Sequence, residues 1–178
     1  MTINLINYAL AKKDWEKAYE DLKVLEKGGR NLIPNSDFTD GLNGWTNWGS
    51  AIERKLVSIT NLPGLTNALH VINSGSGDSG LAMHNISFIK GETYTLSVWV
   101  YNNSSNPIHL QVGTAGIGWR NQQFNVPEDE WARISFTFEA LSDKFGIYFG
   151  TKSGDIDALF TGVKLEKGDK DTPWTPAP

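Results

Sequence analysis

The sequence predicts an all-β protein, a jelly-roll β-sandwich of about eight antiparallel strands preceded by one N-terminal α-helix. Three observations predict this fold class. Glycine makes up 18 of the 178 residues, about 10% against a usual ~7%, which is typical of a chain with many tight turns. Beyond residue 30, apolar and polar residues alternate in short segments separated by turn residues, the pattern of half-buried strands. No second helical segment follows, so the strands are expected to pack against one another.

The first element is a helix over residues 8–27, which contain no glycine or proline and are rich in Ala, Leu, Lys and Glu. Its apolar residues alternate spacings of three and four, as in a heptad repeat. They are Tyr8, Ala11, Trp15, Ala18, Leu22 and Leu25. This stripe has to be buried, and the sequence leaves three ways open: a short coiled coil that makes a homo-oligomer such as a trimer, packing against the protein's own sandwich, or a spacer within a longer chain. Gly28 and Gly29 end the helix, because glycine readily adopts the left-handed C-terminal conformation.

Eight strands follow the helix, and jelly-roll topology divides them into two sheets. One sheet is expected to contain residues 51–59, 80–86, 131–139 and 157–166. The other is expected to contain residues 67–72, 93–101, 107–113 and 144–150. Three domain segments result: an N-terminal helix for linkage or oligomerisation (1–29), the sandwich (30–168) and a C-terminal proline-rich linker (169–178).

Side chains of the second predicted sheet point outward as a candidate ligand-binding face. Sugars stack their C–H faces on aromatic rings, and their hydroxyls bond to side chains that carry donors and acceptors. The strands supply six such residues: Trp99, Tyr101, Tyr148, Gln111, His109 and His70. The glycine-rich connection 113–130 is expected to be a long loop at the rim of the face, and it adds Trp119, Arg120 and Gln122. The remaining aromatics Trp45, Trp131 and Trp174 are expected to be structural.

Composition excludes several kinds of function. The 20 acidic and 16 basic residues give a net charge of −4 without any run of Lys or Arg, which argues against nucleic acid as a partner. The chain has no cysteine, so disulfides, thiol nucleophiles and Cys-ligated metals are excluded. No segment approaches the roughly 20 apolar residues of a membrane span, and no secretory signal is visible at the start.

Three segments together resemble carbohydrate-binding jelly-roll modules of the family 4/9/22 type. The opening Asn31-Leu32-Ile33-Pro34-Asn35-Ser36-Asp37-Phe38, followed by Gly41-Leu42-Asn43-Gly44-Trp45, looks like the start of these modules, and residues 91–99 are similar to their central strand. The ending, residues 163–168 and then Thr172-Pro173-Trp174-Thr175-Pro176-Ala177-Pro178, is especially similar to modules in tail-tip, baseplate and receptor-binding proteins of phages of Gram-positive bacteria.

This resemblance implies a function, a location and partners. It implies non-catalytic binding of host cell-surface polysaccharide by a phage tail or baseplate component, which acts outside the host cell and contacts other tail or baseplate proteins. Release of virions by lysis then accounts for the missing secretory signal. Relatives often hold a structural calcium ion through an acidic residue after the Asp-Phe pair and an Asp in the closing strand. Those positions are Thr39 and Thr161 here, with Asp37, Asp40, Asp155 and Asp157 nearby, so no cofactor is expected beyond a weakly supported calcium ion.

Two other functions compete with this interpretation. A polysaccharide lyase could combine His70 or His109 with Tyr148 and Arg120 for proton abstraction and charge neutralisation. A hydrolase needs two facing carboxylates, and the predicted face contains no Asp or Glu. A purely architectural virion protein would instead bury Trp99 and Tyr101 against another protein.

Overall fold

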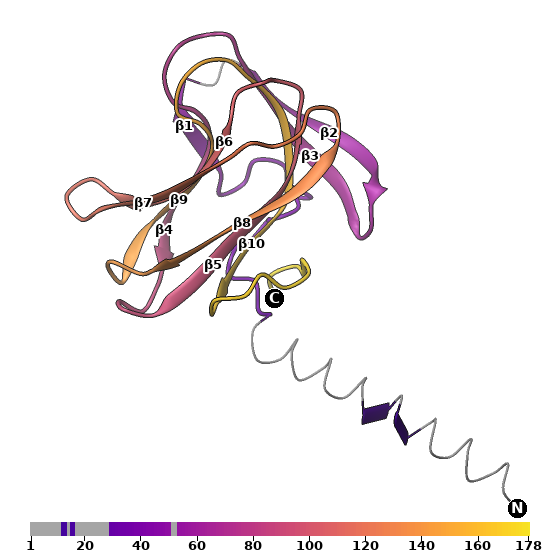
Figure 1. Ribbon diagram of the computed structural model, residues 1–178, viewed down its shortest axis with the longest axis vertical. Helices are drawn as coiled ribbons and strands as arrows, with labels where there is room; N and C mark the ends of the chain where they lie inside the picture. The colour runs from indigo at the N-terminus through magenta and orange to yellow at the C-terminus, as the bar shows by residue number, and fades with distance from the viewer. Residues whose placement is uncertain (1–11, 14, 17–28, 51–52) are drawn as a thin grey trace, which may run out of the picture.

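The computed structural model describes residues 12–13, 15–16, 29–50 and 53–178, and the strands among them form two packed β-sheets (Figure 1). The fold class predicted from the sequence is therefore confirmed. The strands are β1 (Thr46–Gly49), β2 (Glu53–Leu62), β3 (Leu65–Asn73), β4 (Ser79–Ser87), β5 (Thr93–Asn102), β6 (Ile108–Thr114), β7 (Gly118–Phe124), β8 (Trp131–Glu139), β9 (Lys144–Thr151) and β10 (Ile156–Lys167).

Each sheet has five strands, and all the named strands pair antiparallel. Sheet A has the order β1-β4-β9-β6-β7, and sheet B has the order β2-β3-β10-β5-β8. The apolar side chains of the two sheets meet between them, as the alternating pattern predicts. Val98 and Val100 on β5 face Ile147 and Phe149 on β9, and all four are fully buried. Each such side chain contributes roughly 1.5–3 kcal/mol when it is removed from water.

The predicted division of the strands between the sheets is wrong. Strand β4 belongs with β9 and β6 in sheet A, whereas β3 and β5 belong to sheet B. Alternation identifies which side chains point inward, but it reads the same whichever sheet a strand joins. Sheet membership depends on pairing between strands distant in sequence, such as β4 with β9, and no local pattern records that pairing.

The structure also contains two strands that the sequence analysis did not predict, β1 and β7. Strand β7 pairs with β6 at the edge of sheet A, within the segment that was expected to be a loop. Its residues are polar or exposed on both faces, as is common at a sheet edge, so it shows no apolar alternation. Strand β1 has only four residues, too few for a periodic signal.

The two ends of the sandwich meet at the buried side chain of Asn31. Its Nδ2 donates to Ser36 Oγ and to the carbonyls of Val163 and Thr175 at 2.9–3.1 Å, and its Oδ1 accepts from the backbone N–H of Leu165. Amide side chains carry both donors and acceptors, so one Asn joins the opening segment, β10 and the C-terminal segment. Figure 1 shows the C-terminus beside the start of the sandwich.

The C-terminal residues 171–175, which the sequence predicts to be part of a linker, lie against the outer face of sheet B. Trp174 Nε1 donates to Ser36 Oγ at 3.1 Å, and Thr175 Oγ1 donates to the carbonyl of Gly29 at 3.2 Å. These contacts join the C-terminal segment to the opening segment of the domain.

The predicted N-terminal helix falls almost wholly outside the described residues. The four described positions in it, 12, 13, 15 and 16, are helical, and Trp15 is 76% exposed. The proposed coiled-coil seam and oligomeric state stay predictions. Among the described residues, no helix has the length and apolar character needed to cross a membrane.

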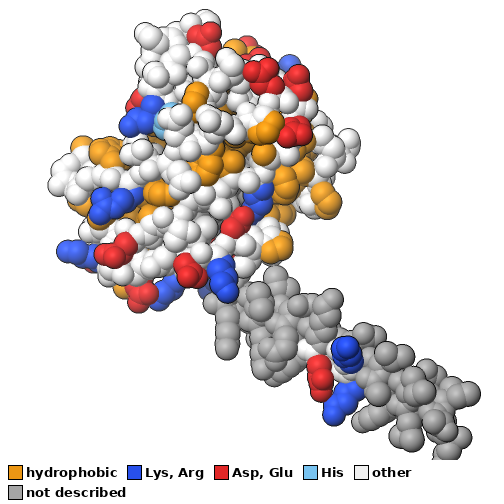
Figure 2. All heavy atoms as spheres, viewed as in Figure 1, with side chains coloured by type: hydrophobic (Ala, Val, Ile, Leu, Met, Phe, Trp, Pro, Cys, Tyr) orange, Lys and Arg blue, Asp and Glu red, His pale blue; other side chains and the backbone are white. Residues whose placement is uncertain are grey.

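One face of the described residues carries charged side chains of both signs. Figure 2 shows Lys and Arg interspersed with Asp and Glu around a band of hydrophobic side chains on the visible face. Phosphate-backbone binding requires clustered positive charge, and the expectation that nucleic acid is not a partner stays a prediction.

Candidate functional site

The structure separates the predicted ligand-binding residues into two groups on opposite sides of the sandwich. Tyr148, Gln111, His109 and Trp119 belong to sheet A, whereas Trp99, Tyr101 and His70 belong to sheet B. The expected single face is therefore wrong, as a direct consequence of the strand division. Each group lies on the outer face of its sheet, because the alternate residues of the same strands fill the core.

Tyr148 is the centre of an aromatic cluster on the outer face of sheet A. Its ring centroid lies 5.9 Å from that of Trp48 on β1 and 5.3 Å from that of Trp119 on β7, both edge to face. The ring of His84 on β4 lies 5.5 Å away. Trp48, Ala82 and Tyr148 form a small apolar cluster apart from the main core. We call the outward residues Trp48, His84, His109, Gln111, Trp119 and Tyr148 the aromatic face.

Glycines on the outer side of sheet A let these rings lie close to the backbone. A Cβ atom at Gly146 would lie 2.9–3.1 Å from the Tyr148 side chain, and one at Gly113 would lie 3.0 Å from Cε3 of Trp119. Both distances are shorter than ordinary carbon contacts of about 3.5–4.0 Å. A side chain at Gly146 would displace the Tyr148 ring, whereas one at Gly113 would meet the backbone oxygen of Gly118 as well as Trp119 and disturb the pairing of β6 with β7. Both glycines therefore set the shape of the face.

Polar atoms lie beside the rings of the aromatic face. Ala82, Tyr148, Gln111 and Asn121 are aligned across four neighbouring strands, which places the Gln111 amide next to the phenol. Tyr148 Oη lies 3.3 Å from His84 Nδ1. Amides, phenols and imidazoles can both donate and accept hydrogen bonds, which suits them to hydroxyl groups of a ligand.

Two titratable groups of the aromatic face, His109 and Tyr148, are held in their neutral forms. Burial, with the positive charge of Lys152, lowers the pKa of His109 below its ordinary value of 6.5. Burial raises the pKa of Tyr148 above its ordinary value of 10.0. Removal from water disfavours the charged form of both groups, so at neutral pH these two groups offer hydrogen bonds without net charge.

Arg120 and Gln122 do not join the aromatic face. Strand β7 alternates, and its pairing places Trp119 and Asn121 beside outward residues of β6, while Arg120 and Gln122 pair with inward positions Val112 and Leu110. Both side chains are exposed beyond the edge of the core. The sequence analysis treated residues 113–130 as a loop, in which no alternation separates Trp119 from Arg120.

Trp48 and His84 are the members of the aromatic face that the sequence analysis missed. Trp48 lies in the four-residue β1, next to the corner that buries Trp45. His84 precedes Asn85, which has a φ of 62°, within the irregular register between Met83 and Ile86. The sequence held one signal for them, the alternation of sides along a strand. Trp48 is two residues after Thr46 and His84 is two residues after Ala82, so each points to the same outward side as that neighbour.

The other predicted site residues lie on the outer face of sheet B. Trp99 and Tyr101 are outward on β5 and half-buried, with Trp131 of β8 5.7 Å from Tyr101 between ring centroids. His70 Nε2 lies 2.7 Å from Asp157 Oδ1, so this histidine is engaged in an ion-pair geometry. Burial would raise the pKa of Asp157, but hydrogen bonds from His70 and Asn103 outweigh it and lower that pKa overall.

The residues at the calcium positions of the resembling modules do not fit a calcium site. Thr39 Oγ1 donates to Asp37 Oδ1 at 2.9 Å, and Thr161 Oγ1 donates to the carbonyl of Asn67 at 2.6 Å. Calcium requires six to eight oxygen ligands, usually with several carboxylates. Within the part of the chain that the structure describes, no three His, Cys, Asp or Glu side chains gather in a way that could hold a metal ion.

Comparison with known families decides what kind of domain carries this face. The model of the CBM_4_9 family, described as a carbohydrate binding domain, matches residues 30–158, which is most of the sandwich. The chain belongs to this carbohydrate-binding family. The sequence-based resemblance to carbohydrate-binding modules is thereby confirmed. No curated protein sequence matches the chain.

Solved structures with the same fold include carbohydrate-binding modules and a phage protein. The CBM22-1 xylan-binding domain of Paenibacillus barcinonensis Xyn10C is 13% identical, with 79% of this chain and 96% of that domain covered and a TM-score of 0.59. TmCBM61 in complex with β-1,4-galactotriose is 18% identical, with 78% and 99% covered and a TM-score of 0.59. The enzymatically active domain of tailspike protein 4 of bacteriophage CBA120 is 10% identical, with 78% of this chain but 21% of that chain covered and a TM-score of 0.59. At identities this low, the comparison shows that this chain has the same fold as the three structures.

Proposed function

We propose that the aromatic face binds a neutral polysaccharide of a bacterial cell surface, without catalysis, in a tail or baseplate component that recognises the host of a phage. The observation that carries this proposal is the cluster of Trp48 and Trp119 around Tyr148, with the Gln111 amide beside it. Trp119, which is 40% exposed, offers a ring on which the C–H face of a sugar can stack, while Tyr148 and Trp48, 8% and 7% exposed, support it from the sheet.

The charge of the face favours a neutral ligand. No member of the aromatic face is a carboxylate, ammonium or guanidinium group, and His109 has a lowered pKa. An acidic polysaccharide would need a positive partner, and the one arginine of strand β7, Arg120, lies on the other side of that strand.

The assignment to a phage tail rests on the ending of the chain. Residues 163–168 and 172–178 resemble the ends of tail-tip and baseplate modules, and the tailspike structure shares the fold. Such a protein would act on the virion outside the host cell, and other tail or baseplate proteins would be its partners. An oligomer such as a trimer, joined through the N-terminal helix, would strengthen weak individual sites because linked sites bind together.

Sedimentation with purified cell walls of Gram-positive bacteria tests the proposal. Trp119, which is 40% exposed, should be a major contact, so Trp119→Ala is expected to weaken binding about tenfold, or about 1.4 kcal/mol, with unchanged thermal stability. Ile117→Ala removes a side chain with a similar exposed fraction of 43% from the tip of the same hairpin and is the matched control. Equal binding by the two variants, or no binding of the parent protein to any wall preparation, would contradict the proposal.

One observation favours a second candidate function, that of a polysaccharide lyase. The 3.3 Å approach of Tyr148 Oη to His84 Nδ1 is within reach of proton transfer after small adjustment. The raised pKa of Tyr148 opposes its action as a base, and His70 and Arg120 lie away from the pair. New unsaturated sugar ends formed by the parent protein, and lost in Tyr148→Phe, would favour a lyase over simple binding.

A further inference from the structure

The outer face of sheet B carries two neighbouring hollows that the aromatic face does not include. The first has a volume of about 440 Å³, and its walls include Leu62, Leu65, Trp99, Arg133 and Trp174. The second has a volume of about 350 Å³ and includes Tyr101, Trp131 and Leu159. Small-molecule sites typically have volumes of about 300–1,000 Å³. We call the two hollows together the sheet-B groove.

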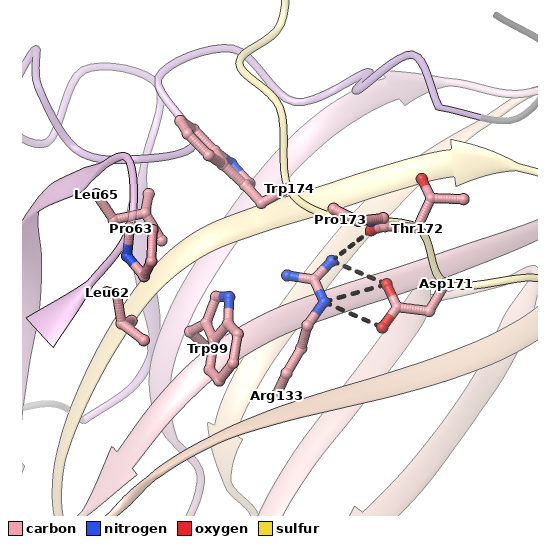
Figure 3. Close-up of a pocket in the computed structure, with 9 residues that line it drawn as sticks. All are labelled: Leu62, Pro63, Leu65, Trp99, Arg133, Asp171, Thr172, Pro173 and Trp174. Atoms are coloured by element: carbon pink, nitrogen blue, oxygen red, sulfur yellow. Dashed lines mark hydrogen bonds and ion pairs between the residues drawn. The ribbon is translucent and has the colours of Figure 1, made fainter. Parts of the chain in front are cut away.

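Both hollows lie along the paired strands β5 and β8. Trp99 pairs with Arg133, and Tyr101 pairs with Trp131, in the register of β5 with β8. Residues two apart on a strand point to the same side and lie about 6.6 Å apart along it. Trp99 and Tyr101 therefore place two aromatic rings in succession along the groove, with Trp131 beside the second ring. Trp174 lies at the wall of the first hollow, on the same side as Trp99 (Figure 3).

Gly162 explains why the Trp99 ring can lie where it does. This residue has a φ of 56° at the irregularity of β10, and a Cβ atom there would lie 2.8 Å from Leu65 Cδ1 and 3.1 Å from Trp99 Cδ1. A side chain would displace both walls of the first hollow. The left-handed backbone conformation also favours glycine, so the shape of the hollow depends on this one position.

Arg133 supplies a hydrogen-bond donor that none of the described residues uses. Its Nε and Nη2 bind the carboxylate of Asp171 at 2.8–3.2 Å, and Nη2 also donates to Ser97 Oγ. Its Nη1 is buried without a partner, and Figure 3 shows this nitrogen on the side of the guanidinium that faces Trp99 and Trp174. A buried donor without an acceptor is destabilising, and an oxygen of a ligand bound in the hollow would supply the missing acceptor.

Among the described residues that line it, the first hollow has no unpaired positive charge, although Arg133 is part of its wall. Arg133 is paired with Asp171, and below it Lys164 Nζ lies 3.6 Å from a carboxylate oxygen of Glu166, both side chains fully buried. Each positive group thus has its own counter-charge. An anionic ligand would meet the Asp171 carboxylate, whereas an uncharged oxygen could accept from Nη1 without charge repulsion.

We infer that the sheet-B groove is a second saccharide site, which binds neutral sugar rings on Trp99 and Tyr101 with a sugar oxygen accepting from Arg133 Nη1. The wall formed by residues 171–174 is fixed in advance, because Lys164 donates to Thr172 Oγ1 at 2.6 Å and Thr172 donates through its N–H to Glu166. A preformed wall lowers the entropy cost of binding. Two sites on opposite sheets would let one domain bridge two chains of a polysaccharide, or two segments of one.

Tryptophan indole N–H signals in a ¹⁵N NMR titration of the full chain test this second site. The probes are xylohexaose, β-1,4-galactotriose and neutral fragments of Gram-positive wall polysaccharide. In the Trp119→Ala variant, at least one probe is expected to shift the signals of Trp99 and Trp131. Adding Trp131→Ala to that variant should weaken the remaining binding at least about tenfold, while adding Ile89→Ala, a control at an exposed residue of the β4–β5 connection, should not. Retained signal dispersion confirms that each variant is folded.

The titration separates the second site from the proposed function. Shifts at Trp119 in the parent protein without shifts at Trp99 and Trp131 would overturn the second site and leave the aromatic face intact. Shifts at Trp99 and Trp131 alone would support the second site and contradict the aromatic face. Signals of the groove that change with protein concentration but with none of the probes would overturn the second site in favour of contact between copies of the chain.

Discussion

The outer faces of the two sheets differ in what lies over them. On sheet A, glycines such as Gly113 and Gly146 leave room for the rings of Trp119 and Tyr148 directly above the backbone. On sheet B, the C-terminal segment covers part of the face and buries the Lys164–Glu166 pair beneath it. One sheet therefore has an aromatic face from which Trp119 projects, and the other has a groove walled by the C-terminal segment.

This difference separates what holds the domain together from what binds a ligand. The contacts of sheet B with residues 171–175 include buried charges, whose loss has a large effect on folding. The aromatic face contributes little to the main core, since Trp48, Ala82 and Tyr148 form a small apolar cluster apart from it. Changes on sheet B should therefore affect stability most, and changes on sheet A should affect saccharide binding most.

The largest effect is expected for Lys164→Met. This change leaves the Glu166 carboxylate buried without its partner and removes the donor to Thr172 and Pro173, so the free energy of unfolding should fall by roughly 3–5 kcal/mol. Urea unfolding measures it. Lys167→Met is the matched control, because Lys167 pairs with Glu92 on the surface at 3.2 Å and such pairs contribute about 0–1 kcal/mol.

Binding at the aromatic face should survive this change. At a temperature where Lys164→Met is still folded, its saccharide affinity at Trp119 should equal that of the parent protein, because the two faces belong to different sheets. A similar loss of stability in Lys164→Met and Lys167→Met would show that the buried pair does not hold the C-terminal segment.

Gly146→Ala is expected to show the opposite pattern to Lys164→Met, with a smaller loss of stability and a loss of saccharide binding. The added methyl group meets the Tyr148 ring at 2.9–3.1 Å, and displacement of the ring should lower saccharide affinity severalfold while stability falls by about 1–3 kcal/mol. Affinity electrophoresis in polysaccharide gels measures the binding. Gly75→Ala, where the methyl group would meet only the Asn73 side chain, should bind like the parent protein. Unchanged binding in Gly146→Ala would mean that the position of Tyr148 is not important for the ligand.

The smallest effect concerns pH. Because the folded pKa of His109 is lowered below its ordinary value of 6.5, the unfolded chain takes up a proton first as pH falls, so stability is lost from about pH 6.5 downward. Melting temperatures measured between pH 7.5 and 5 should therefore decline less in His109→Gln than in the parent protein. Parallel pH profiles of the two proteins would show that His109 is not the group responsible.

The sequence predicted the strands far better than it predicted the site. Alternation around Val98 and Ile147 identified inward residues correctly, because burial on one face leaves a local signal. The combination of Trp99 with Tyr148 was wrong, because the choice between sheets depends on distant pairing that alternation does not record. Trp48 was missed because its strand is too short to show a period. The glycines were counted as turn formers, although Gly113 and Gly146 act within strands.

A crystal structure of the protein grown with the oligosaccharide that binds it most tightly is the most direct test of the proposed function. Sugar density is expected on the outer side of sheet A, in contact with Tyr148 and Trp119 and within hydrogen-bond distance of Gln111. Density confined to any other surface, with these three side chains free of sugar, would contradict the proposed function.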